Sequence, residues 1–192
     1  MKKFSVKSGF TLIEILVVIT IIGILSVVIY ANFGGARQVA VNKSFRSELK
    51  EMQLAIELYK SQYGKYPNAA TGAPCGGSNP ATNYADSTLC GLTDYITGLT
   101  PDYIPKLLSH ESSSNPNCNI KYYVDKVNFS FYKLIAENCF AGATSPSNGI
   151  DQNDEFARCP SAPTCPVGGN CVPTAPVYYS SLAIYSPGAE CM

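Results

Sequence analysis

The carboxylate of Glu14 is the group in this sequence whose position most needs a chemical explanation. It follows Gly9-Phe10-Thr11-Leu12-Ile13 and stands near the start of an apolar run that reaches about Phe33. Burying one ionised side chain in hydrocarbon costs about 2.5–3.5 kcal/mol even on permissive insertion scales. We therefore expect Glu14 to have a partner, and we expect that partner to determine the function.

The cysteines are the second group with chemistry to account for. All eight lie in the last two thirds of the chain, namely Cys75, Cys90, Cys118, Cys139, Cys159, Cys165, Cys171 and Cys191. This distribution is typical of an exported protein in an oxidising compartment. Zinc ligation is the alternative, but the sequence has no Cys-x-x-Cys and its single histidine, His110, lies in a Ser-rich stretch, so we favour disulfides.

Two disulfide pairs follow from position along the chain. A Cys75–Cys90 bridge would close a loop, and a Cys118–Cys139 bridge would close the open end of a predicted hairpin. Eight cysteines allow about a hundred connectivities, so the complete pairing stays open.

An acidic run at residues 151–155 is a weak calcium candidate. Its oxygen ligands would be Asp151, Asn153, Asp154 and Glu155. An EF-hand loop requires a glycine after its third ligand position, and this chain has Phe156 there. We therefore favour a solvated acidic turn and expect no cofactor.

The remaining ionisable groups indicate neither an enzyme nor a nucleic-acid binder. His110 has no nucleophile or carboxylate in a recognisable catalytic arrangement. The chain has 14 basic and 14 acidic side chains, and three of its lysines precede Gly9, so removal of residues 1–9 leaves a mild excess of acids. No basic patch for nucleic acid is evident. Two formal glycosylation sequons, at Asn42 and Asn128, fall in a predicted helix and a predicted hairpin, and we discount both.

Residues 1–9 form a basic leader, and residues 10–33 form the apolar segment that the leader precedes. The positive-inside rule places everything after this segment outside the cytoplasm. At about 23 residues the run exceeds the roughly 7–15 residues of a secretory signal. It also contains Glu14 and lacks a convincing Ala-x-Ala site. We therefore expect a retained membrane helix, in a chain with room for one modest domain besides.

Residues 34–64 are predicted to continue this helix as an amphipathic one. Apolar residues recur at helical spacing: Val41, Phe45, Leu49, Met52, Ile56, Tyr59 and Tyr63. We expect this stripe to pack on the chain's own globular domain, in preference to a coiled-coil seam. Gly34 and Gly35 form a weak point, because each glycine costs about 1 kcal/mol relative to alanine in a helix. The helix should end at Gly64, with Pro67 just beyond.

Residues 65–192 are predicted to form a small globular head. Residues 68–90 are expected to be a loop and residues 92–108 a turn-rich segment. Two strand-like runs, 120–124 and 129–136, suit an antiparallel hairpin, and a last strand is expected at 177–185. The fold class is therefore α+β, with one long amino-terminal helix packed on a small antiparallel sheet.

The stretch from Gly9 to Glu14, with Lys2 and Lys3 before it and an unbroken apolar helix after it, resembles the type IV pilin and type II secretion pseudopilin superfamily. The likeness is most specific over about the first 25 residues. It continues more loosely through Tyr63-Gly64-Lys65-Tyr66-Pro67 and through residues 99–105 and 132–137.

This resemblance implies a sequence of events for the amino terminus. A membrane prepilin peptidase would cut between Gly9 and Phe10, Phe10 would be N-methylated, and Glu14 would guide assembly. Glu14 would pair with the new amine of a neighbouring subunit, which removes the cost of a lone buried charge. Many members carry a proline near position 31, where this chain has Ala31. The pair Gly34-Gly35 would then supply the weak point.

We therefore expect a structural subunit, not an enzyme. Its precursor would cross the cytoplasmic membrane once with an exported head, and its processed form would join other pilin-like subunits in a fibre on an inner-membrane assembly platform. Pilus, DNA-uptake pilus and secretion pseudopilus remain open. Two other hypotheses are a membrane-tethered binding domain that does not polymerise and a secreted enzyme cleaved after Ala31, which no catalytic constellation supports.

Overall fold

A single helix, α1 (Leu12–Tyr63), runs through two compact units of the chain, Met1–Ala40 and Val41–Met192. The computed structural model describes residues 10–72, 74–78, 82–90, 94–113, 115–140 and 180–189, without the side chains of residues 28–33. Several predictions lie outside these residues: the leader with Gly9, the calcium candidates Asp151, Asn153, Asp154 and Glu155, and the cysteines Cys159, Cys165, Cys171 and Cys191.

The carboxyl end of α1 lies where the sequence predicts it. Gly64 adopts a positive φ of 72°, and its N–H donates to the carbonyl of Lys60 at 2.7 Å. A residue in this left-handed conformation commonly ends a helix, and glycine adopts it without a Cβ penalty. At the glycine pair Gly34-Gly35 the helix is continuous, and a Cβ added to either residue would meet open space.

The second unit contains one five-stranded antiparallel sheet in the order β1-β2-β3-β4-β5. Its strands are β1 (Gly76–Ser78), β2 (Thr82–Asp86), β3 (Asn119–Asp125), β4 (Tyr132–Glu137) and β5 (Leu182–Tyr185), and a short 3-10 helix, η1, covers His110–Ser112. The predicted hairpin is thus β3–β4, and of the predicted last strand, residues 177–185, β5 forms over 182–185. The α+β fold class is confirmed.

The prediction of a loop over residues 68–90 was wrong where β1 and β2 form. These strands carry little apolar sequence, but β2 pairs with β3 from Thr82↔Asp125 to Asp86↔Lys121. Gly76 allows β1 to approach β2 closely, since a Cβ there would lie 2.0 Å from the carbonyl oxygen of Tyr84. Backbone pairing with a strand far along the chain therefore overrides the local composition.

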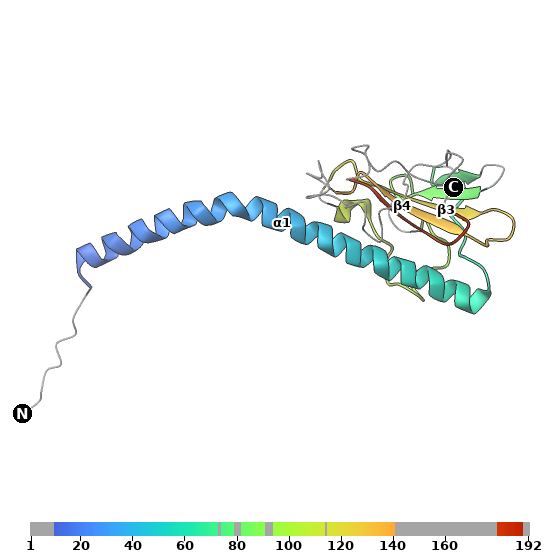
Figure 1. The fold of residues 1–192 in the computed structure, drawn as a ribbon, viewed down its shortest axis with the longest axis horizontal. Helices are drawn as coiled ribbons and strands as arrows, with labels where there is room; N and C mark the ends of the chain where they lie inside the picture. The colour runs from blue at the N-terminus through green and yellow to red at the C-terminus, as the bar shows by residue number, and fades with distance from the viewer. Residues whose placement is uncertain are drawn as a thin grey trace, which may run out of the picture. The chain divides into compact units, whose positions relative to one another are not determined.

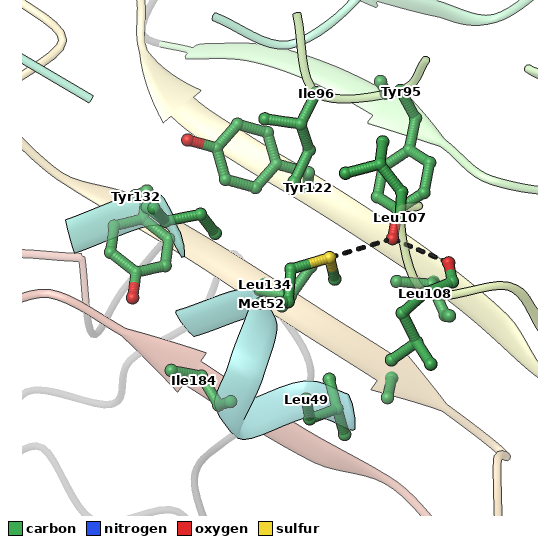
Figure 2. Packing of buried hydrophobic residues seen from close by; sticks show 14 of the residues in the cluster. Leu49, Met52, Tyr95, Ile96, Leu107, Leu108, Tyr122, Tyr132, Leu134 and Ile184 are labelled. Carbon is green, nitrogen blue, oxygen red and sulfur yellow. Dashed lines mark hydrogen bonds between the residues drawn. The ribbon is translucent and has the colours of Figure 1, made fainter. Parts of the chain in front are cut away.

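The predicted apolar stripe of α1 supplies one side of the core. Figure 1 shows this part of the helix running along one face of the sheet. Phe45, Leu49, Met52 and Ile56 are buried, and they belong to one cluster with residues from the inner face of the sheet, such as Tyr122, Leu134 and Ile184 (Figure 2). Tyr63, the last residue of the stripe, is instead 55% exposed.

Three buried tyrosines of this core differ in their hydrogen bonding. The hydroxyl of Tyr95 donates to the carbonyl of Leu108 at 2.8 Å and contacts the Met52 sulfur at 3.4 Å (Figure 2). The Tyr122 hydroxyl donates to the carbonyl of Pro67 at 2.9 Å. The Tyr132 hydroxyl is buried without a hydrogen-bond partner among the described residues.

Two disulfides staple the head, and both are the pairs predicted from position. Cys75–Cys90 closes a segment with a sequence separation of 15, and Cys118–Cys139 closes the β3–β4 hairpin with a separation of 21. The Cα atoms of the pairs lie 4.1 and 4.3 Å apart. For these four cysteines the disulfide prediction is confirmed and the zinc alternative is excluded.

Candidate functional site: the amino-terminal segment

The start of α1 is built around a reciprocal pair of hydrogen bonds between Thr11 and Glu14. The Thr11 hydroxyl accepts from the Glu14 backbone N–H at 3.3 Å. In return, Glu14 Oε2 accepts from the Thr11 backbone N–H at 2.8 Å and from the Thr11 hydroxyl at 2.7 Å. This is the arrangement of a capping box, which satisfies backbone donors that a helix start leaves without partners.

The role of Thr11 was missed by sequence reasoning, although the signal was present. Thr-x-x-Glu at a helix start is the sequence pattern of a capping box, and residues 11–14 match it. The contacts also leave part of the carboxylate accessible. Both bonds to Glu14 use Oε2, and no described residue bonds to Oε1. A cation from another chain could therefore approach Oε1 without breaking the cap.

Apolar side chains surround α1 on every side after Glu14. Those of the first unit are about half exposed or more, including Leu12 at 85%, Ile24 at 68% and Val27 at 71%. Burying one such Leu, Ile or Val side chain contributes roughly 1.5–3 kcal/mol. Covering the segment with lipid or with other apolar helices therefore stabilises it. Among the described residues, no helix combines the length and the hydropathy required to cross a membrane.

Two hydroxyl groups in this segment form hydrogen bonds within the helix. Thr20 donates to the carbonyl of Val17 and Ser26 to the carbonyl of Ile22, both at 2.7 Å. Such back-bonding satisfies a hydroxyl without water. The segment between Leu12 and Val27 thus carries Glu14 as its single ionisable group.

The other candidate residues do not assemble into a site. The Nδ1 atom of His110 lies 3.4 Å from the hydroxyl of buried Ser87, which already accepts from the Ile120 N–H. Within the described ranges no three His, Cys, Asp or Glu side chains are grouped as a metal site would need. Asn128 lies in an exposed turn after β3, in the hairpin connection where the sequence places it.

The amino-terminal part of the chain is similar to known proteins. Residues 5–30 match the family described as "Prokaryotic N-terminal methylation motif", a range that includes Gly9, Phe10 and Glu14. The chain is similar to the type II secretion system core protein G of Aeromonas hydrophila, with 35% identity over 66 residues, 34% of this chain and 46% of that protein.

Two further relatives carry the same name. The type II secretion system core proteins G of Vibrio cholerae and Escherichia coli K12 are 32% and 33% identical over 72 residues, 38% of this chain and 49% and 50% of theirs. The chain thus spans about half the length of the curated relatives it matches. No solved structure gave a significant match.

The methylation motif and the distant similarity to the core proteins G support a prepilin-like protein of the type IV pilin and type II secretion pseudopilin superfamily. The long amino-terminal helix and the disulfide-stapled antiparallel head agree with this class. The relatives here are the core proteins G of type II secretion systems, so within that superfamily the chain is related to pseudopilins. The superfamily is structural and not enzymatic.

Proposed function

We propose that this chain is the precursor of a pseudopilus subunit. A prepilin peptidase cuts it between Gly9 and Phe10, Phe10 is N-methylated, and α1 packs with the helices of other pilin-like subunits into a fibre. The methylation motif over residues 5–30 and the names of the relatives support this proposal. Before assembly the apolar half of α1 anchors the precursor in the inner membrane with its head exported, and the membrane assembly platform extracts it.

The capped Glu14 is the observation on which the proposal depends most. Cleavage creates a cationic amine on Phe10, at the amino end of the same helix. Four residues separate it from Glu14, which is about 6 Å along a helix axis at 1.5 Å per residue. A neighbouring subunit displaced by this distance brings its amine to the level of Glu14. The pair neutralises both charges in an apolar surrounding and sets the axial register.

The first experiment identifies the amino terminus of the membrane-extracted protein by mass spectrometry. The expected result is a chain that begins at Phe10 and carries one additional methyl group. The variant Gly9→Val should keep residues 1–9, because the peptidase cleft must accept a small residue before the cut. A wild-type chain that begins at Met1 would support the membrane-tethered binding domain and overturn our proposal.

The second experiment separates assembly from processing. Glu14→Gln keeps the size of the side chain and much of its capping capacity but removes its charge. We expect this variant to be cleaved and methylated and to yield few fibres, while Thr11→Ser, which retains the capping hydroxyl, should form fibres at the wild-type level. Normal fibre formation by Glu14→Gln would contradict the proposed role of the carboxylate.

A further inference from the structure

A pocket on the head is lined by two acids of α1 and by an apolar segment. Glu48 and Glu51 form its helical side, residues 104–108 form the other side with Ser112, and its volume is about 170 Å³. Glu51 is exposed and Glu48 is half-buried, and the Ser44 hydroxyl contacts Glu48 Oε1 at 3.4 Å. With Lys106 at the rim, the lining carries a net charge of −1.

The chemistry of this lining suits a long basic side chain. A lysine can lay its aliphatic stem along apolar side chains while its ammonium group remains with polar or charged partners. Here the wall is provided by Ile104, Leu107 and Leu108, and the carboxylates of Glu48 and Glu51 can accept hydrogen bonds from the ammonium group.

Lys43 of α1 is the basic residue in the right position to enter such a pocket from another copy of the chain. It is exposed, and no described residue pairs with its ammonium group. Lys43 and Glu48 are five residues apart, which places them roughly 140° apart around one helix and about 7.5 Å apart along its axis. They therefore face different directions on one chain and cannot pair within it, but parallel copies can bring them together.

The required displacement matches the one already inferred at the amino terminus. The Phe10 amine precedes Glu14 by four residues, and Lys43 precedes Glu48 by five. In both pairs the cation lies on the amino-terminal side, so one axial shift of about 6–7.5 Å between parallel helices satisfies both. Two nearby cations fit less well: Arg37 lies about 16 Å from the level of Glu48, and Arg46 already interacts within its own chain.

We propose that Lys43 of one subunit inserts into the Glu48–Glu51 pocket of the next subunit and forms a second axial contact, in the heads, in register with the Phe10–Glu14 contact. This inference rests on the proposed function, since it requires fibres with parallel α1 helices. The pair lies closer to water than Glu14 does, so added salt weakens it more.

Charge reversal with restoration tests the contact in cells that assemble the full chain. We expect Lys43→Glu to lower the yield of sheared fibres at least tenfold, and Glu48→Lys with Glu51→Lys to do the same. Combining all three substitutions should restore the yield to within about threefold of wild type. Lys126→Glu, which reverses an exposed charge in the turn after β3, is the matched control and should leave the yield unchanged.

Cross-linking of wild-type fibres gives a readout that folding defects cannot imitate. A carbodiimide joins an amine to a carboxylate directly, with loss of one water molecule. The covalent dimer should contain a peptide linking Lys43 to Glu48 or Glu51. Dimers joined through a different lysine, or normal fibre yield from Lys43→Glu, would overturn this contact alone. A wild-type chain that is processed at Phe10 but makes no fibres would overturn the contact and the proposed function together.

Discussion

Tyr95→Phe should destabilise the head, whereas Tyr132→Phe should not, although both side chains are fully buried. Each substitution removes one hydroxyl and leaves the ring in place. At position 95 it also takes the 2.8 Å donor away from the Leu108 carbonyl. Leaving a buried acceptor without its donor costs about 1–3 kcal/mol.

We do not expect the same change at position 132 to lower the stability of the head. The Tyr132 hydroxyl lacks a hydrogen-bond partner among the described residues. The nearby Glu57 carboxylate adds to burial in raising the pKa of this hydroxyl but does not meet the geometry of a hydrogen bond, so folding removes the hydroxyl from water with little compensation. Burial of an unsatisfied hydroxyl costs about 1–3 kcal/mol in proteins. Tyr132→Phe should therefore be neutral or stabilise the head by about 1 kcal/mol, which places the two variants roughly 1–4 kcal/mol apart.

Urea unfolding of the full chain in detergent micelles, followed by the near-ultraviolet circular dichroism of the tyrosines, measures this difference. For a urea dependence of about 2 kcal/mol per molar, the two midpoints should differ by roughly 0.5–2 M. Tyr122→Phe is an internal standard, because its hydroxyl also donates to a backbone carbonyl, and it should behave like Tyr95→Phe. Equal losses in Tyr95→Phe and Tyr132→Phe would refute the reasoning.

Four further predictions follow from the same structure. Burial raises the pKa of the Tyr95 and Tyr122 hydroxyls, so stability should be complete below about pH 10 and fall above it by roughly 1.4 kcal/mol per pH unit for each tyrosine. Urea unfolding at a series of pH values measures this fall, and Tyr95→Phe should make it less steep. Replacing Cys118 and Cys139 by serine should lower the free energy of unfolding by about 3 kcal/mol, measured by heat or urea, because the bridge closes a segment with a separation of 21 residues. An unchanged free energy of unfolding would show that the backbone hydrogen bonds between β3 and β4 stabilise the hairpin without the bridge. Gly76→Ala should separate β1 from β2, since the new Cβ would lie 2.0 Å from the Tyr84 carbonyl oxygen, whereas Gly23→Ala, which meets open space, should not alter the head; amide exchange in β1 distinguishes the two. In assembled fibres, residues 32–36 should exchange their amide hydrogens faster than both flanks, and Gly34→Ala with Gly35→Ala should slow that exchange by about fivefold per glycine. Uniform protection in the wild type would contradict a weak point there.

The parts of the fold that the sequence predicts are those with a strong local signal. The helical spacing from Phe45 to Ile56 predicted the core face of α1, and Gly64 predicted its end. The alternation around Tyr122 and Leu134 predicted the β3–β4 hairpin, and the flanking cysteines predicted its staple. Each of these features depends on neighbouring residues, so no knowledge of the tertiary structure was needed.

The features that were missed depend on pairing with distant residues. Strands β1 and β2 form because β3 presents backbone groups to them, and the segment containing Gly76 and Asn83 gives no local sign of this. The burial of the helix stripe could be predicted, but not that Tyr63 would be exposed. At the amino terminus, the sequence predicts a role for Glu14, which stays a prediction, and its bond to Thr11 was seen only in the structure.

The short strands at the borders of the sheet have a consequence for the proposed fibre. Strands β1 and β5 contain three and four residues and stand at the two ends of the strand order. A repeating array brings identical sheet edges to a high local concentration, where long open strands would pair from chain to chain and aggregate. Short borders offer few backbone groups for such pairing, so in the proposed fibre the heads would remain separate while the helices associate.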